Sequence, residues 1–312
     1  MMPPGSDDYL DVDVAYLVGL IVARGTFREQ GNERALILDF PYGNMQMDAI
    51  RTHFDQQVHL RLAIGEIKNR LYELLQTDIQ DEYSASFVRL SVRFTRNTMA
   101  WRNLRLLTGG KANFWEFDIP AQVENAPQDI RREFLRGVAD AAGYVRQSNN
   151  YMGQRRRVYL EIANRNWRLP IQLCRMLQVG LGIPVQTIQW GHPNTREPFN
   201  PGSGQAWARE HQVKVFVEAF EALGFSIAYK QQALSEFADD DRQRFGGRAQ
   251  MCNPKTKHVR RRKPPHPEEA SLLLPEELRG RHCDAYWQVC RRMGCRQGAR
   301  PEGAVSLMSE ED

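Results

Sequence analysis

Apolar residues recur with two different periods along the chain, and these periods separate expected strands from expected helices. Within residues 86–94, every second residue is apolar and most of the others are polar or basic. A period of two is typical of a half-buried strand with one polar face. The apolar members are Val88, Leu90, Val92 and Phe94. Trp101, Leu104 and Leu107 follow at helical spacing, so we expect a helix to close this segment.

The segment before this strand has the pattern of a hairpin followed by a helix. Residues 26–40 contain two expected strands, and residues 30–32, which read Gln-Gly-Asn, separate them. Glycine and asparagine at such an interruption are typical of a turn between two strands. Met45, Ile50 and Phe54 then lie on one side of an expected helix.

The second half of the chain repeats this order. Residues 144–162 have the pattern of a second hairpin, and residues 167–179 have that of a helix that ends at the Gly-Leu-Gly-Ile-Pro stretch of residues 180–184. The remaining expected elements are strands at 185–190 and 212–217 and helices at 218–223 and 230–237. Each half therefore reads helix, two strands, helix, two strands, helix, which predicts an α+β fold.

A nine-residue motif opens both halves and is the most specific feature of the sequence. It runs from residue 17 to Gly25 and again from residue 135 to Gly143. Each copy has a glycine and an alanine four residues apart, which gives a helix a strip of small side chains. These residues are Gly19, Ala23, Gly137 and Ala141. We expect the two helices to pack side by side through this strip, and Gly25 and Gly143 to end them with a positive φ.

Both motif copies resemble the signature helix of the LAGLIDADG homing endonucleases, which cut long DNA sites. The resemblance covers roughly residues 12–240. It is also carried by Ile119-Pro120, by Phe134-Leu135-Arg136-Gly137, and by residues 210–225 with Tyr229-Lys230-Gln231 after them. It implies a single-chain, pseudo-dimeric protein in which two αββαββα repeats form a pseudo-twofold saddle. The implied repeats are residues 1–122 and 123–245, followed by a basic linker and a small helical segment with an acidic tail at 246–312.

In such a scaffold the strands after each motif helix lie in the major groove of double-stranded DNA, and their outward side chains contact bases and phosphates. By alternation from Val158, Leu160 and Ile162, the outward set of one strand includes Arg157, Tyr159 and Glu161. The candidates in the first half are Arg28, Gln30, Arg34, Arg89 and Arg93. Those in the second half are Arg146, Gln147, Asn149, Arg155, Arg156, Arg157, Tyr159, Gln186, Gln189, Gln212 and Lys214.

The resemblance also implies a catalytic position, because the family carries a metal-holding acid at the eighth motif residue. Here these residues are Arg24 and Ala142. Metal-assisted hydrolysis of a phosphodiester requires carboxylates to hold the ion, whereas an arginine suits a phosphate directly. We therefore expect a DNA-binding protein that has lost nuclease activity and needs no cofactor.

Two alternatives remain open at this point. The first is an active endonuclease that uses Mg²⁺ and recruits other acids, the candidates being Asp140, Glu29, Asp11 and Asp13. Asp140 stands two residues before Ala142, which turns it by about 200° away from the site, and Lys230 is interpreted as a surface lysine in preference to a catalytic one. The second alternative is a scaffold that binds another protein.

The C-terminal segment contains cysteines and histidines that fit no standard zinc-site spacing. The least unfavourable zinc set is Cys252, His258, Cys290 and Cys295. Cys283 and Cys290 stand seven residues apart, which favours packed thiols of a helix. The basic run at residues 255–263 fits an arm along a phosphate backbone and a plain linker equally well. A protein partner for this segment is a further possibility.

The composition adds little to this picture. The net charge is +4, five cysteines occur without framework spacing, and no stretch reaches the 18 or so apolar residues that span a bilayer. We expect a cytoplasmic monomer. The sequence contains no Rossmann glycine motif, no phosphate-binding loop, and no HExxH or GxSxG motif.

Overall fold

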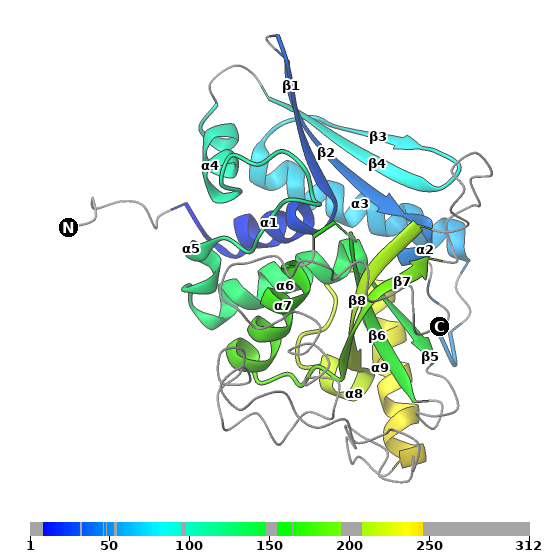
Figure 1. The fold of residues 1–312 in the computed structure, drawn as a ribbon. Coiled ribbons are helices and arrows are strands. Elements are labelled where there is room, and N and C mark those ends of the chain that lie inside the picture. The colour runs from blue at the N-terminus through cyan, green and yellow to red at the C-terminus, as the bar shows by residue number, and fades with distance from the viewer. Residues whose placement is uncertain are drawn as a thin grey trace, which may run out of the picture. The chain divides into compact units, whose positions relative to one another are not determined.

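The computed structural model describes residues 9–245, except for positions 32, 46, 48, 53–54, 95–97, 148–154, 164, 167 and 195–207. Figure 1 shows the chain as alternating groups of helices and strands. The first half contains α1 (Val12–Arg24), β1 (Gly25–Gln30), β2 (Glu33–Pro41), α2 (Tyr42–Met45), α3 (Gln56–Leu75), β3 (Ile79–Tyr83), β4 (Phe87–Phe94) and α4 (Met99–Leu107).

The second half has the same order of principal elements. It contains α5 (Ala121–Glu124), α6 (Gln128–Ala142), β5 (Gly143–Gln147), β6 (Arg156–Ala163), α7 (Leu169–Arg175), the π-helical turn η2 (Met176–Gly180), β7 (Thr187–Asn194), β8 (Ala208–Phe216), α8 (Val217–Phe220) and α9 (Ala228–Phe245). Apart from the short helices α2, α5 and α8 and the turn η2, each half therefore has the predicted αββαββα order, and the predicted α+β fold is confirmed.

The two sheets match strand by strand. The first has the order β1-β2-β4-β3 and the second β5-β6-β8-β7. In the first sheet, Leu38 of β2 lies opposite Leu90 of β4. In the second, Leu160 of β6 lies opposite Val213 of β8. The internal repeat inferred from the sequence thus extends to the strand order, and apolar residues lie opposite each other in the central strands of both sheets.

By contacts, the chain divides into two compact units. The first comprises residues up to Tyr144 together with Leu223–Phe237, and the second comprises Val145–Ala222 and the residues from Ala238 on. Helix α6 opens the second repeat in the sequence but belongs to the first unit, because it packs on α1. The repeat boundaries at residues 122 and 245 describe the order of elements, and they stay a prediction.

The motif helices α1 and α6 approach each other through backbone at two glycines. A side-chain carbon placed on Gly19 would lie 2.1 Å from the carbonyl oxygen of Phe134, and one on Gly137 would lie 2.1 Å from that of Tyr16. No real side-chain carbon tolerates such a distance. Ala23 and Ala141 are also buried. The predicted side-by-side packing of the motif helices is confirmed, and glycine is required at its centre.

The predicted positive φ at the ends of these helices is wrong. Gly25 has φ −88° and ψ 149°, and Gly143 has φ −100° and ψ 145°, so both adopt the extended conformation of a strand. At Gly25 the requirement is space, because a side-chain carbon there would lie 2.6 Å from Cα of Ile21. The chain turns directly from the last helical turn into β1, and the strand starts against the helix backbone.

The helix predicted around Met45, Ile50 and Phe54 is also misplaced. Helix α3 begins only at residue 56, because the carboxylate of Asp55 caps it by accepting from the backbone N–H groups of Gln57 and Val58 at 3.0 Å each. Ile50 is 42% exposed, and Phe54 lies outside the described residues. The predicted element order includes a strand where β3 lies, but the sequence did not locate it, because only its first residue is buried and its sequence shows no alternation.

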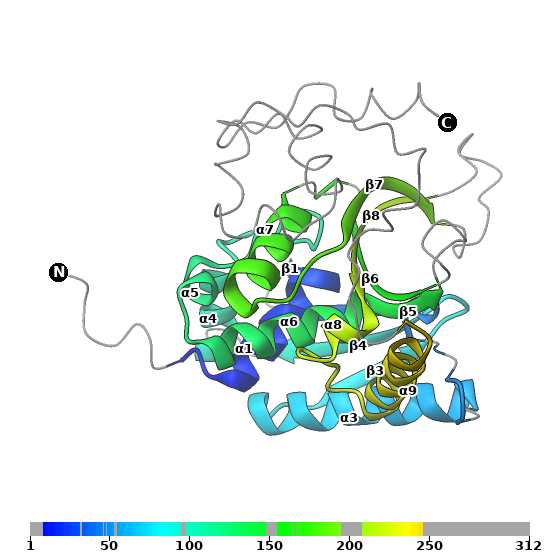
Figure 2. The same ribbon diagram turned by 90° about the horizontal axis from the view of Figure 1, so that it is seen from below.

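The apolar face of the first sheet packs in the core of the first unit, with α3 on that side (Figure 2). The buried residues of the central strands are Leu36, Leu38, Phe40, Val88, Leu90 and Val92. Those of α3 are Leu60, Ala63, Ile64, Ile67 and Leu71. The other face of this sheet carries polar side chains. Within the described part of the chain, no helix has the length and apolar character needed to span a membrane.

We predict that Gly19→Ala and Gly137→Ala each destabilise the protein by roughly 1–3 kcal/mol, because the added methyl group would force α1 and α6 apart. Gly65→Ala in α3 is the matched control. Nothing lies within 4 Å of a side-chain carbon at that position, so the change should stabilise the helix by roughly 0.5–1 kcal/mol. Denaturant unfolding measures all three. Equal effects at the three glycines would contradict the close packing of the motif helices.

Candidate functional site

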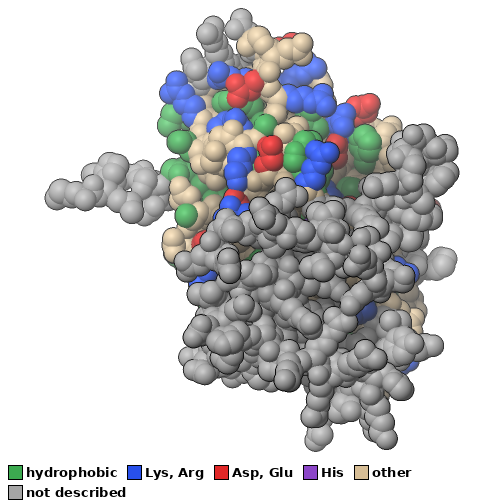
Figure 3. All heavy atoms as spheres, in the orientation of Figure 1, with side chains coloured by type: hydrophobic (Ala, Val, Ile, Leu, Met, Phe, Trp, Pro, Cys, Tyr) green, Lys and Arg blue, Asp and Glu red, His purple; other side chains and the backbone are tan. Residues whose placement is uncertain are grey.

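Two arginines stand out on the polar face of the first sheet. Arg28 of β1 and Arg93 of β4 both lie opposite Ala35 of β2, one on each side. Two strand spacings separate them, which is roughly 10 Å. Both are exposed, and neither forms an ion pair with any residue that the structure describes. Figure 3 views this sheet from the side opposite α3, and Lys and Arg side chains gather over its strands.

A third predicted arginine on this face is neutralised within the chain. Arg89 donates to both carboxylate oxygens of Asp39, at 2.7 and 3.0 Å, and its guanidinium lies 5.0 Å from the ring centre of Phe87. The hydrogen bond to Asp39 raises the pKa of Arg89. Because a bidentate pair already satisfies this guanidinium, it is a weaker candidate for a phosphate than Arg28 or Arg93.

Arg34 lies on the opposite face from Arg28, contrary to the expected outward set. It pairs in register with the buried Phe94, and its guanidinium lies 5.9 Å from the ring centre of Trp101 in α4. Alternation along β2 turns Arg34 towards the helix side. Gln30, two residues after Arg28, keeps the polar face and is exposed.

The second sheet also has a polar face, which again results from alternation along its strands. On β6, Arg157, Tyr159 and Glu161 alternate with Val158, Leu160 and Ile162, as predicted. Tyr159 lies opposite Lys214, and Glu161 opposite Gln212. Gln189 of β7 extends the same row beyond Gln212. We call these side chains, together with Gln186, the second-sheet cluster. Its members are Arg157, Tyr159, Glu161, Gln186, Gln189, Gln212 and Lys214.

The members of the second-sheet cluster hydrogen-bond one another, and six of the seven are buried. Arg157 donates to the side-chain oxygen of Gln186 at 2.8 Å and to the hydroxyl of Tyr159 at 2.9 Å. Lys214 donates to Gln189, and its amine lies 4.8 Å from the ring centre of Tyr159. Burial, and then the nearby charges of Arg157 and Arg146, lower the pKa of Lys214 to about 7. The cluster therefore combines two basic side chains, Arg157 and Lys214, with one acidic side chain, Glu161.

Arg155 and Arg156 were predicted to contact DNA, and both form ion pairs with carboxylates of the same unit. Arg155 binds Glu218 at 2.7 Å, with both side chains less than a tenth exposed. Arg156 binds Asp240 at 2.5 Å and Asp241 at 2.8 Å. The sequence did carry a signal for this, because residues 239–241 are three consecutive aspartates. By contrast, Arg146 and Gln147 at the end of β5 are exposed.

The last residues of the two motif helices, Arg24 and Ala142, carry no carboxylate. Arg24 is buried at the end of α1, and its guanidinium lies 5.9 Å from the ring centre of Phe114. Ala142 is completely buried at the end of α6. Among the described residues, no three His, Cys, Asp or Glu side chains come together as a set that could hold a metal ion. A guanidinium and a methyl group do not fit the divalent ion that the family resemblance implies at this place.

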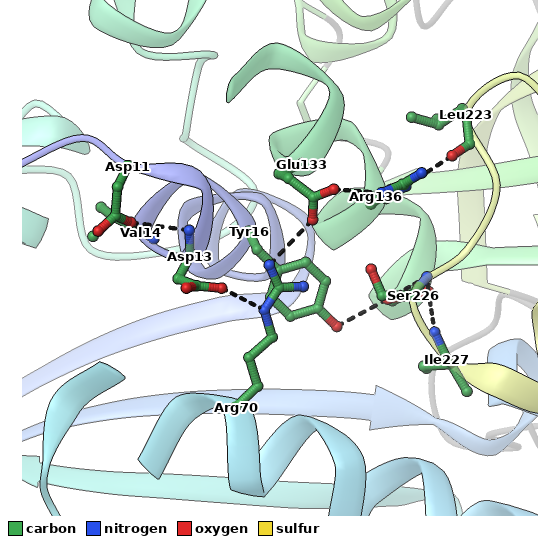
Figure 4. Close-up of polar contacts among 11 residues, drawn as sticks. Asp11, Asp13, Val14, Tyr16, Arg70, Glu133, Arg136, Leu223, Ser226 and Ile227 are labelled. Carbon is green, nitrogen blue, oxygen red and sulfur yellow. Dashed lines mark hydrogen bonds and ion pairs between the residues drawn. The ribbon is translucent and has the colours of Figure 1, made fainter. Parts of the chain in front are cut away.

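Asp140 is fully buried and is used elsewhere. Its carboxylate accepts from the hydroxyl of Tyr16 at 2.9 Å and from the backbone N–H of Ser226 at 3.2 Å, just before α9 (Figure 4). Burial raises the pKa of Asp140, and the charge of Lys230 and these hydrogen bonds oppose the rise. The side chain thus ties α1 and α6 to the segment that leads into α9, in accord with the expected rotation away from the motif end.

The interpretation of Lys230 as a surface lysine is wrong. Lys230 is completely buried, and its amine donates to the carbonyl oxygens of Asp140 at 2.8 Å and Gly143 at 2.9 Å. These carbonyls belong to the C-terminal end of α6, where the helix leaves acceptors without partners. A cation also interacts favourably with that end of the helix dipole. Burial lowers the pKa of Lys230. Lys230 therefore caps the second motif helix.

The other acids proposed for an active nuclease also have partners. Asp11 caps α1 by accepting from the backbone N–H groups of residues 13 and 14, and Asp13 binds Arg70 at 2.8 Å (Figure 4). Both lie at the opposite end of α1 from Arg24, about 16 Å away for a helix of this length. Glu29 pairs with Arg105 of α4 at 3.5 Å. None of the three lies at the motif-helix ends that carry Arg24 and Ala142.

Several predicted residues cannot be placed. Asn149 and the possible zinc set Cys252, His258, Cys290 and Cys295 lie outside the described residues, as does the whole segment from 246 to 312. Cys174 of α7, which the sequence did not single out, is a buried free thiol, and burial raises its pKa to about 12.

Comparison with known proteins finds similar structures but no similar sequences. No protein-family model and no curated protein matches the chain. Solved structures that match include full-length DUF199/WhiA from Thermatoga maritima, with 13% identity and a TM-score of 0.40 over 78% of this chain. The chain spans 63% of the length of that WhiA structure.

Two homing endonucleases are similar as well, and both are bound to DNA in the matching structures. I-WcaI on its recognition sequence matches 75% of this chain and 94% of its own length, with 11% identity and a TM-score of 0.39. I-DmoI with DNA and calcium matches 69% of this chain and 88% of its own, with 16% identity and a TM-score of 0.37. The matching structures also include the N-terminal LAGLIDADG domain of DUF199/WhiA, with 13% identity and a TM-score of 0.36 over 72% of this chain and 87% of that domain.

The buried amine of Lys230 should make stability depend on pH. Its pKa is lowered towards 7 in the folded chain and is about 10.5 in the unfolded chain. Between these values the unfolded state binds more protons, so the stability that Lys230 contributes rises with pH, by on the order of 1 kcal/mol per pH unit. We predict that the difference in unfolding free energy between wild type and Lys230→Gln grows from pH 7 to pH 9.

Chemical denaturation at several pH values measures this difference. Lys111→Gln, at a lysine whose side chain is 38% exposed, serves as the control, and its difference from wild type should stay constant. If the difference in unfolding free energy between wild type and Lys230→Gln does not change with pH, the amine of Lys230 has the same pKa in the folded and unfolded chains.

Proposed function

We propose that the chain binds double-stranded DNA through the polar faces of its two sheets and does not hydrolyse it. The observation that carries the proposal is the exposed arginine pair on the first sheet. Arg28 and Arg93 face the same side across Ala35 and have no ion-pair partner in the part of the chain that the structure describes. Two like charges held near each other without a carboxylate favour an anionic partner.

The form of this surface suits duplex DNA. The major groove admits a two-stranded ribbon, and arginine and glutamine side chains can bind its phosphates or the edges of its bases. We assign the contacts of the first sheet to Arg28, Gln30 and Arg93. In the second unit we assign them to Arg146 and Gln147, with Lys214 and Arg157 adding positive potential. Arg89, Arg155 and Arg156 are left out, because each already binds a carboxylate.

The absence of hydrolysis is proposed from the donor groups at the helix ends. Divalent ions that activate water for attack on a phosphodiester need carboxylate oxygens. Arg24 and Ala142 supply none, and Asp140, the acid nearest to them in the motifs, is engaged by Tyr16 and Ser226. A buried guanidinium at this place would also repel a divalent cation.

We predict that Arg28→Ala with Arg93→Ala weakens binding to duplex DNA and makes it less dependent on salt. Each lost phosphate contact should lower the slope of log K against log salt concentration by about 0.9, so a loss of up to about 2 is expected. Fluorescence anisotropy with a labelled random-sequence duplex measures both quantities. Arg34→Ala is the matched control, because it removes an arginine from the other face of the same sheet. If both variants lose the same affinity and slope, the polar face is not the binding face.

A second prediction concerns the helix ends. Wild-type protein should leave duplex DNA uncut with Mg²⁺ or Mn²⁺, and Arg24→Asp with Ala142→Asp should introduce Ca²⁺ binding in the DNA complex, because it restores two carboxylates. Isothermal titration calorimetry measures the ion. Arg24→Ala is the control, since it removes the cation and adds no ligand. Site-specific cleavage by the wild type that is lost in Asp140→Asn would overturn the non-hydrolytic assignment.

A further inference from the structure

Helix α3 has two apolar faces, although only one of them is buried. The face towards the first sheet carries the core residues from Leu60 to Leu71. The face turned away carries Val58, Leu62 and Tyr72, which are 51%, 56% and 54% exposed. In Figure 2 the helix runs along the lower edge of the view. A helix that is apolar on both sides normally packs on both sides.

The exposed apolar residues lie on one line along the helix, with Gly65 and Asn69 between Leu62 and Tyr72. We call this line the outer stripe; it consists of Val58, Leu62, Gly65, Asn69 and Tyr72. The steps between successive members are four, three, four and three residues, which is the spacing of a seam between two helices. A side-chain carbon at Gly65 would meet nothing within 4 Å, so the middle of the stripe is open. Single exposed apolar residues are ordinary, but a line of them at this spacing marks a contact surface.

Opposite charges border the outer stripe on its two sides. At 100° per residue, Arg61 and Lys68 fall on one border, and Glu66 and Glu73 fall on the other. A partner for this surface must therefore offer an apolar line with the reverse order of charges. A second copy of α3 that runs in the same direction does so, because a twofold axis along the helices places the basic border of each against the acidic border of the other.

We propose that the outer stripe pairs in parallel with the outer stripe of a second copy of this chain, which makes the protein a weak homodimer. In this arrangement Arg61 faces Glu66 of the second copy, and Lys68 faces its Glu73. An antiparallel pair would instead place basic against basic and acidic against acidic residues, which is repulsive. Asn69 of one copy would meet Asn69 of the other inside the seam. A buried asparagine at such a position favours a pair of helices with a single register.

The contacts that these charges make within the chain leave them available. Lys68 forms an ion pair with Asp81 of β3 but keeps 35% of its side chain exposed, and Glu66 accepts from the backbone N–H of Ala228 at 3.1 Å with one of its two oxygens. Exposed ion pairs of this kind are weak and can be shared.

The size of the seam sets the strength of the dimer. From Val58 to Tyr72 the helix is about 21 Å long, which is short for a stable pair of helices, so the dimer should dissociate on dilution. The polar face of the first sheet is on the side away from α3 (Figure 2), so the pairing leaves that face accessible. The proposal does not depend on DNA binding.

Sedimentation equilibrium of the full chain over a wide range of concentrations tests the proposal. The average mass of the wild type should rise from monomer to dimer with concentration, and Leu62→Glu should remain monomeric throughout. Met99→Glu is the matched control, because Met99 of α4 is 69% exposed and lies outside the stripe. Thermal unfolding confirms that each variant is folded. A wild type that is monomeric at every concentration, or a dimer that survives Leu62→Glu, would overturn the proposal.

Two further variants test the direction of the pair. Arg61→Glu and Glu66→Arg should each weaken the dimer, and the two changes together should restore it, because residue 61 of each copy faces residue 66 of the other. Val58→Cys should form an intermolecular disulfide on mild oxidation, since a parallel seam brings each residue next to its own copy. Wild type under the same oxidation controls for the native cysteines. If the double variant does not restore the dimer and Val58→Cys forms no intermolecular disulfide, the parallel arrangement is wrong.

Discussion

The backbone-to-backbone contact between α1 and α6 is the constraint on which the rest of the first unit depends. Gly19 and Gly137 each present bare backbone to the carbonyl group of the other helix, at a separation that excludes any side chain. Core contacts between larger residues can readjust after a substitution, because side chains have alternative rotamers, whereas backbone has no such freedom. This one contact sets how closely the two helices approach, and it explains why each helix carries a glycine at this position.

The polar groups around the helix pair serve the fold. Lys230 caps α6, and Asp140 with Tyr16 joins the two motif helices to the start of α9. Arg70 lies 3.8 Å from the ring centre of Tyr16 and also binds Asp13 and Glu133, so α3 is tied to the same network. Breaking one partner of such a buried network leaves the others without hydrogen bonds in a medium of low polarity, which is costly. These buried polar residues therefore contribute to the stability of the fold.

Much of the fold could be predicted from the sequence, because it depends on local periodicity. The alternation in β4 and β6 and the glycine strips of α1 and α6 gave the element order and the central helix pair. The elements and residues that were predicted wrongly depend on features other than local periodicity. The start of α3 depends on a single cap at Asp55, and β3 is almost wholly exposed, so neither has an apolar pattern. For the candidate site, Arg155, Arg156 and Lys230 were misjudged because their partners lie 60 or more residues away in the chain. Arg34 was misjudged because a shift of one residue along a strand changes its face.

The junctions between the motif helices and their strands contain no loop. Helix α1 ends at Arg24 and β1 begins at Gly25, just as α6 ends at Ala142 and β5 begins at Gly143. Since successive strand residues point to opposite faces, one residue inserted at either junction would exchange Phe27 with Arg28, or Val145 with Arg146, between the core and the polar face. Insertions are tolerable at the tips of the hairpins, where the extra residue disturbs no register. Substitutions on the strands or longer hairpin tips therefore change the polar faces without shifting the register, but the two junctions must keep their length.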